Sequence, residues 1–229
     1  MKAMLLAAGK GTRMMPLTAT TPKPLLKAAG LSLIEHQIVK LRGAGFTDLV
    51  INHAWLGMQL EAALGDGSKH RVTIAWSRED EPLETAGGIV QALPLLGAGP
   101  FVVVNADVWT DFRFARLRLA LKEGKQVHLV LVPNPEHHPR GDFSLGEQGN
   151  LLLPQAGLPT YTYSGIAVFD PSLFAGVSER KYPLLPLLKE AIASGTATAQ
   201  VYRGEWSDIG TPERLRELDR RLALQAAAL

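Results

Sequence analysis

The first 105 residues of this chain alternate short apolar runs with runs of helical periodicity, and this alternation limits the possible folds. Apolar runs typical of buried strands cover Met4–Ala8, Asp48–Asn52, Val72–Trp76 and Phe101–Asn105. Between them, apolar residues recur at helical spacing in Leu33–Ala44, Gly57–Leu64 and Gly87–Leu93. Such alternation predicts a parallel sheet covered by helices, so we expect a Rossmann-like, three-layer α/β/α fold.

The second half of the chain is less regular. Val127–Val132 and Tyr161–Phe169 read as strands, and Leu184–Ser194 and Glu213–Ala226 read as helices. Residues 133–165 are otherwise rich in proline, glycine and polar residues. We therefore expect a mixed, mostly parallel central sheet in one domain spanning residues 1–229, with halves of about 1–107 and 108–229.

Composition excludes several classes of protein. The 229 residues carry a net charge of only +2, and the basic residues are scattered, which argues against a nucleic-acid platform. The chain has no cysteine, so disulfides and thiolate metal sites are excluded. No apolar run reaches the ~18 residues of a membrane span, and the start lacks a secretory signal. We expect a cytoplasmic protein with no membrane partner.

A glycine-containing loop follows the first strand and points to a nucleotide. Gly9 and Gly11 allow the backbone N–H groups to approach a polyphosphate, while Arg13 and Lys23 supply cations that neutralise it. The loop is not a Walker A motif, because Lys10 precedes Gly11, and it is not a dinucleotide fingerprint, because Met14 replaces the third glycine. A nucleotide-handling enzyme is the leading hypothesis.

Two aspartates far apart in the sequence could hold a metal. Asp107 directly follows the strand at Phe101–Asn105, and Asp208 lies in a turn before the last helix, for which Thr211 and Pro212 provide a cap and a first residue. Each aspartate could also be a simple turn residue. Mg²⁺ takes few protein carboxylates and bridges phosphate oxygens, which suits such a pair.

The loop sequence resembles the signature of the sugar-1-phosphate nucleotidyltransferases. The match covers Leu6–Met14, then Pro16-Leu17-Thr18 and Pro22-Lys23-Pro24, and Trp206–Thr211 is similar to a second motif of that family. The resemblance implies that Arg13 and Lys23 bind a nucleoside triphosphate. It also implies that a sugar 1-phosphate attacks the α-phosphorus and that Asp107 and Asp208 bind Mg²⁺. We expect the transferase core without the appended repeat domain of larger members.

Longer matches narrow the resemblance to the N-acetylmuramate α-1-phosphate uridylyltransferases, which use UTP. They are Asn52–Gly57, Pro82–Gly88, Asp107–Asp111, Arg140–Phe143 and Tyr163–Gly165. Glu84 and Ala106 replace glycines that are common elsewhere in the family. The residues alone are also compatible with a plain loop from Glu81 into a helix capped by Thr85.

The resemblance assigns the site residues as follows. The first half would bind the nucleotide through Ala8, Gly9, Gly11, Thr12, Arg13, Lys23, Glu81, Thr85 and Gly87. Catalysis would depend on Arg13, Lys23 and Asp107. The second half would bind the sugar through Asn105, Asp142 and Ser164, with Asn105 the best supported, whereas loop solvation is an equal explanation for the other two.

Alternatives remain open. A mannose-1-phosphate guanylyltransferase or a hexose-1-phosphate uridylyl- or thymidylyltransferase would share the loop and both aspartates. A non-catalytic nucleotide-sugar-binding regulator has little need for two metal carboxylates, and a nicotinamide oxidoreductase needs the missing third glycine. The pair His137-His138 has no further ligands at zinc spacing, so we interpret it as a loop feature.

Overall fold

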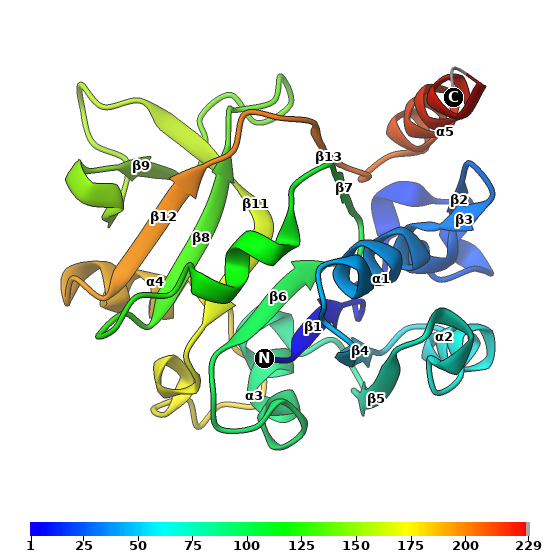
Figure 1. Cartoon of the computed structure of the whole chain (residues 1–229), viewed down its shortest axis with the longest axis horizontal. Coiled ribbons are helices and arrows are strands. Elements are labelled where there is room, and N and C mark those ends of the chain that lie inside the picture. The colour runs from blue at the N-terminus through cyan, green and yellow to red at the C-terminus, as the bar shows by residue number, and fades with distance from the viewer. Residues whose placement is uncertain (228–229) are drawn as a thin grey trace.

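A computed structural model describes residues 1–227, and a nine-stranded sheet forms its centre (Figure 1). Four strands of the first half run parallel in the order β6-β1-β4-β5. Their bounds are Ala3–Leu6 (β1), Asp48–His53 (β4), Thr73–Arg78 (β5) and Phe101–Asn105 (β6). The connecting helices are α1 (Leu33–Gly43), α2 (Gly57–Leu64) and α3 (Glu84–Leu96).

The strand order reverses at β1. This strand pairs with β4 on one side and with β6 on the other, so the chain moves one way through α1 and α2 and returns through α3. In such sheets a crevice opens beyond the carboxyl ends of the strands at the point of reversal. The glycine loop follows β1 and Asp107 follows β6, so the topology brings both to this point.

The second half extends the same sheet. β11 (Thr160–Phe169) lies antiparallel to β6 and to β8 (Val127–Val132), and β12 (Ala197–Val201) runs parallel to β8. β9 (Phe143–Leu145) and β10 (Leu151–Leu152) add an antiparallel extension. Two small sheets stand apart: β7 (Val108–Thr110) with β13 (Trp206–Asp208), and β2 (Lys27–Ala28) with β3 (Leu31–Ser32).

Helices cover both faces of the sheet, because alternate strand residues point to opposite sides. Met4 packs in a cluster with α3 and with α4 (Leu184–Ala193), whereas Leu5 packs in a second cluster with α1 and α2. The three-layer α/β/α fold with a mixed central sheet is therefore confirmed.

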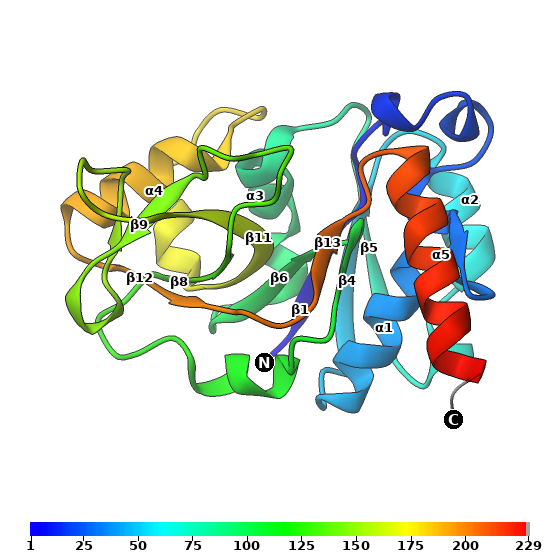
Figure 2. The same ribbon diagram turned by 90° about the horizontal axis from the view of Figure 1, so that it is seen from above.

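The last helix, α5 (Pro212–Ala227), lies beside the β2–β3 hairpin on the outside of the first half (Figure 2). Leu215 and Leu218 are buried in a third cluster with Met14 and Trp109, whereas Leu224 is 67% exposed. This cluster joins α5 to the loop after β1, so the helix that follows Asp208 is fixed against the nucleotide side of the molecule.

The structure differs from the sequence-based expectation in several segments. α3 begins at Glu84, three residues before the predicted Gly87. The sequence did not predict five short strands, because runs of two to five residues carry little periodicity. They are β7, β9, β10, β12 and β13. The single domain and its division near residue 107 stay predictions, and residues 228 and 229 of that domain lie outside the described residues. No helix within residues 1–227 has the length and apolarity needed to span a membrane.

Candidate active site

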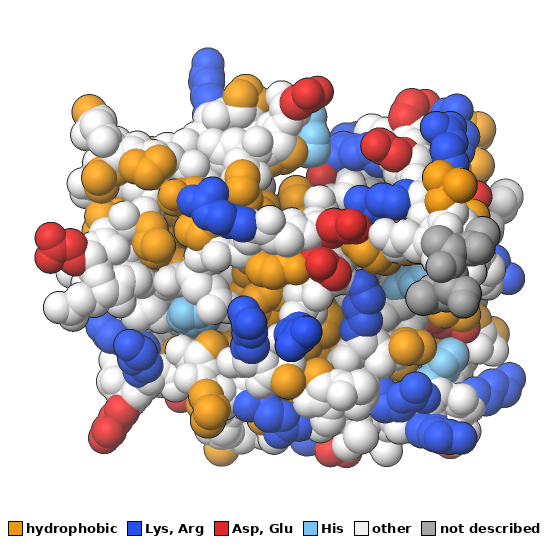
Figure 3. Space-filling model, turned by 45° about the horizontal axis from the view of Figure 1, so that its top comes forward, with side chains coloured by type: hydrophobic (Ala, Val, Ile, Leu, Met, Phe, Trp, Pro, Cys, Tyr) orange, Lys and Arg blue, Asp and Glu red, His pale blue; other side chains and the backbone are white. Residues whose placement is uncertain are grey.

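A cavity of about 400 Å³ opens beyond the carboxyl ends of β1 and β6. It brings together most of the predicted nucleotide residues with Asn105 and Asp107. Its lining is Leu6, Ala7, Ala8, Gly9, Gly11, Thr12, Arg13, Met14, Lys23, Pro24, Asn52, Glu79, Pro82, Leu83, Glu84, Thr85, Asn105, Ala106, Asp107 and Gly210. On the face drawn in Figure 3, basic and acidic side chains are interspersed, as on an ordinary solvated surface.

The tight turn after β1 explains the spacing of its motif. Gly11 has a φ of +64°, and a Cβ there would lie 3.0 Å from Cγ2 of Thr18 and 3.1 Å from Cβ of Lys23. The hydroxyl of Thr18 donates to the carbonyl oxygen of Gly11 at 2.8 Å. Only glycine fits this left-handed, crowded position without strain. The turn thus places Arg13 and Lys23 on the cavity wall.

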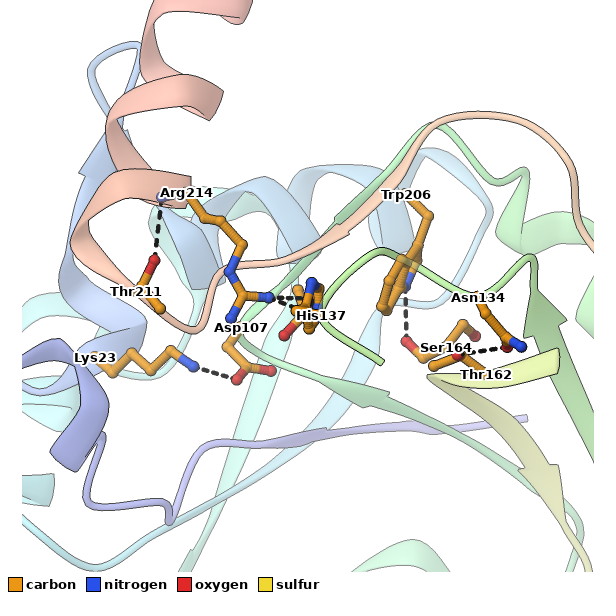
Figure 4. A network of polar contacts seen from close by, with 10 residues as sticks. Lys23, Asp107, Asn134, His137, Thr162, Ser164, Trp206, Thr211 and Arg214 are labelled. Atoms are coloured by element: carbon orange, nitrogen blue, oxygen red, sulfur yellow. Dashed lines mark hydrogen bonds and ion pairs between the residues drawn. The ribbon is translucent and has the colours of Figure 1, made fainter. Parts of the chain in front are cut away.

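Lys23 and Asp107 form an ion pair across the cavity (Figure 4). The Lys23 side chain is 10% exposed and that of Asp107 is 32% exposed, so the pair lies at the inner edge of the site. Arg13 also lines the cavity but is exposed. The site therefore holds one exposed cation and one buried cation that could both face a polyphosphate.

Asp208 reaches the same end of the molecule through β13. It pairs with Val108 across the β7–β13 sheet, and the N–H of Ile209 donates to the carbonyl oxygen of Asp107 at 2.8 Å. The Asp208 carboxylate contacts Arg214 at 2.5 Å and His137 at 3.0 Å. Within residues 1–227, no three histidine or acidic side chains gather closely enough to form a metal cage. Two carboxylates on neighbouring backbones fit Mg²⁺, which needs few protein oxygens, and not zinc.

A buried polar pair, absent from the sequence-based prediction, forms the opposite wall. Nδ2 of Asn52 donates to Oε1 of Glu79 at 2.6 Å, and Oε2 of Glu79 accepts from the N–H of Leu83 at 3.0 Å. Burial raises the pKa of Glu79 above its ordinary value, against the effect of these hydrogen bonds. Asn52 lies in the predicted strand and Glu79 just past another, so their position at strand ends is the signal that could have found them.

Asn105 is held at the cavity by the strand beside it. Gly165 in β11 has a φ of +77°, and a Cβ there would lie 2.6 Å from Nδ2 of Asn105. The neighbouring Ser164 is buried: its hydroxyl donates to the carbonyl oxygen of Val130, and its own carbonyl accepts from the Trp206 indole (Figure 4). Ser164 therefore shapes the strand irregularity next to Asn105, and its hydroxyl does not line the cavity.

Three further residues of the predicted nucleotide site, Gly87, Thr85 and Glu81, differ in position or role from the prediction. Gly87 faces away from the cavity, because a Cβ there would collide with the carbonyl oxygen of Arg180. Thr85 does not cap α3; the helix begins earlier, and the carbonyl oxygen of Tyr182 accepts from the N–H groups of Ala86 and Gly87. Thr85 does line the cavity, whereas Glu81 is exposed beside it.

Asp142 lies in the second half and also stands apart from the cavity lining. Its carboxylate accepts from the N–H of Tyr163 at 2.8 Å and contacts His138 at 2.9 Å. The two adjacent histidines thus contact different carboxylates, His138 that of Asp142 and His137 that of Asp208. The position of His137 beside a predicted metal ligand is a feature that the sequence did not reveal.

The sequence matches the model of the family described as nucleotidyl transferase over residues 2–224. The chain belongs to the nucleotidyl transferase family. A solved structure shares the architecture described above: a putative glucose-1-phosphate thymidylyltransferase from Bacillus anthracis superposes with a TM-score of 0.83 over 96% of this chain and 94% of its own, at 20% identity.

Two relatives of this nucleotidyl transferase match along almost their whole length. The N-acetylmuramate alpha-1-phosphate uridylyltransferase of Neisseria meningitidis is 49% identical over 222 residues, 95% of this chain and 96% of that protein. The protein of the same name from Caulobacter vibrioides is 34% identical over 96% of each chain. The cavity therefore belongs to a sugar-1-phosphate nucleotidyltransferase.

Proposed function

We propose that this nucleotidyl transferase joins UTP and N-acetylmuramate 1-phosphate to give UDP-N-acetylmuramate and pyrophosphate. The full-length relationship to the two uridylyltransferases carries this assignment. The reaction would serve the recycling of bacterial cell-wall sugars, and an enzyme that uses these phosphorylated substrates would act in the cytoplasm.

The residues around the cavity support the chemistry. A phosphate oxygen of the sugar 1-phosphate attacks the α-phosphorus of UTP, and the bond to the β-phosphate oxygen breaks to release pyrophosphate. The nucleophile is already an anion, so no general base is required, and catalysis consists of positioning and charge stabilisation. Lys23 would hold the α-phosphate or the sugar phosphate in line, and Arg13 would stabilise charge on the leaving pyrophosphate.

Asp107 and Asp208 would hold Mg²⁺. Their carboxylates are hard oxygen donors on adjacent backbones, and each contacts a cation of the protein. When bound, Mg²⁺ supplies positive charge to the reacting phosphates. Asn105 would contact the sugar, and the backbone N–H groups of the loop from Ala8 to Thr12 would bind the triphosphate.

The test is pyrophosphate release in the presence of Mg²⁺, measured for UTP, GTP, dTTP, ATP and CTP against the 1-phosphates of N-acetylmuramate, N-acetylglucosamine, glucose and mannose. We expect turnover with UTP and N-acetylmuramate 1-phosphate, and its loss in Asp107→Asn. Turnover only with another pair would overturn the substrates and keep the family. Binding of UTP without turnover on any pair would favour a regulator.

A further inference from the structure

Arg214, which no motif singles out, contacts the carboxylate of Asp208, which lies two residues before Gly210 of the cavity lining. Its Nη1 lies 2.5 Å from Oδ1 of Asp208 and 2.9 Å from Nε2 of His137, and that ring nitrogen lies 3.0 Å from the same Oδ1 (Figure 4). One ring nitrogen cannot accept from Arg214 and donate to Asp208 at the same time. The three contacts therefore cannot all be hydrogen bonds, and Nε2 of His137 satisfies either Arg214 or Asp208 but not both.

The position of Arg214 in its helix is electrostatically unfavourable. It lies in the first turn of α5, where the helix dipole disfavours a cation. Its side chain is nevertheless only 18% exposed. The absence of a side chain at Gly210 leaves space for the Arg214 guanidinium. A Cβ there would lie 2.7 Å from Nη2 of Arg214 and 3.3 Å from Oδ2 of Asp208. Gly210 also lines the cavity, so the guanidinium lies at its edge.

The two carboxylates are matched by two cations. Lys23 contacts Oδ2 of Asp107 and Arg214 contacts Oδ1 of Asp208, so a divalent cation competes with a cation of the protein for each of these two oxygens. Lys23 is fixed by the crowded turn at Gly11. Arg214 instead contacts His137, which belongs to the half of the chain that would bind the sugar. Of the two cations, Arg214 is therefore the one that could bind a second partner on the sugar side.

We propose that Arg214 occupies the Asp208 carboxylate until the metal binds there, and then binds the phosphate group of the sugar 1-phosphate. This inference rests on the proposed function. In this exchange the metal replaces the guanidinium on Asp208 and the phosphate replaces Asp208 on the guanidinium, so both the carboxylate and the arginine keep a partner of opposite charge. The planar fork of arginine matches two oxygens of a phosphate, which lysine cannot do.

The test separates metal binding from turnover. Mn²⁺ is titrated by electron paramagnetic resonance, without substrates, into the wild type, Arg214→Gln, Arg214→Lys and Asp208→Asn. The control is Arg216→Gln, which removes one positive charge from an exposed arginine of the same helix that pairs with Glu213. Removing the competitor should tighten Mn²⁺ binding in Arg214→Gln by about tenfold, the lower end for a hydrogen bond to a charged group. Asp208→Asn should weaken Mn²⁺ binding, and Arg216→Gln should leave it unchanged.

Steady-state kinetics provide the second measurement. In Arg214→Gln the KM for the sugar 1-phosphate should rise by about tenfold while the KM for UTP stays within about twofold. Arg214→Lys restores the positive charge but not the bidentate guanidinium. Its KM for the sugar 1-phosphate should therefore lie between those of the wild type and Arg214→Gln. Weaker Mn²⁺ binding in Arg214→Gln would mean that Arg214 merely supports Asp208, and an equal rise in both KM values would exclude a specific contact; either result overturns the inference. The proposed function fails separately, if the wild type shows no metal-dependent turnover.

Discussion

Asn52 donates a hydrogen bond from Nδ2 to Oε1 of Glu79 over 2.6 Å, and both side chains are buried. Oδ1 of Asn52 also accepts from the N–H of Ala7 at 2.9 Å. The amide therefore ties the start of the glycine loop to the segment that enters α3, on the other wall of the cavity. A Cβ at Gly88 would lie 2.7 Å from Oε1 of Glu79, so the same pair explains why the second glycine of the Gly87-Gly88 pair must be small.

Asn52→Leu should destabilise the protein and weaken UTP binding together. The substitution leaves the N–H of Ala7 and an oxygen of Glu79 buried without partners, which costs about 2–4 kcal/mol. Urea unfolding measures the first effect and the KM for UTP the second. Gln59→Leu is the matched control, since that amide donates to the carbonyl oxygen of Thr20 at the surface. Equal shifts of the unfolding midpoint in the two variants would contradict this role of Asn52.

The sequence predicted the parts of this molecule that depend on periodicity and on long motifs. The strands that became β1, β4, β5 and β6 carry apolar runs, and their alternation with helices determines the switch point where the cavity opens. Residues joined by tertiary contacts could not be predicted in this way. Arg214 and His137 are 77 positions apart, one in α5 and the other in the loop between β8 and β9, so no local pattern joins them.

Gly165→Ala should impair binding of the sugar 1-phosphate in addition to the stability it loses through backbone strain. The residue has a φ of +77°, which costs an alanine about 1 kcal/mol, and its Cβ would displace Asn105. Gly195→Ala is the control, because Gly195 has a φ of +70° and no atom within 4 Å of the added Cβ. Both variants should lose similar stability in thermal unfolding, but only Gly165→Ala should show a raised KM for the sugar 1-phosphate. If both kept wild-type kinetics, Asn105 would not contact the sugar.

Glu84→Gly should stabilise the protein. Glu84 begins α3 with a φ of +64°, in the left-handed region that glycine adopts freely. Relief of this strain should raise the free energy of unfolding by about 1 kcal/mol. Glu84→Ala removes the same carboxylate but keeps the strain, so it should show no gain. A gain of equal size in both variants would assign the effect to charge and not to the backbone.

His128→Phe should make stability less dependent on pH between about 4 and 6.5. The hydroxyl of Thr198 donates to the carbonyl oxygen of Val127, so Nδ1 of His128 must donate to that hydroxyl, at 2.9 Å. Nε2 is then a buried acceptor, with no partner among residues 1–227. Burial, and secondarily the charge of Lys122, lowers the pKa of His128 from 6.5 to about 4.

The direction of this effect follows from proton binding. As the pH falls below 6.5, the unfolded chain binds a proton at His128 that the folded protein refuses until about pH 4, so protonation favours unfolding across this range. Between pH 7 and pH 4.5 the wild type should lose about 2 kcal/mol more stability than His128→Phe. Phenylalanine fills the same space between β8 and β12 without a buried acceptor, so the variant should fold. Urea unfolding at both pH values gives the difference. Parallel losses in the two proteins would mean that the folded protein binds the His128 proton over the same pH range as the unfolded chain.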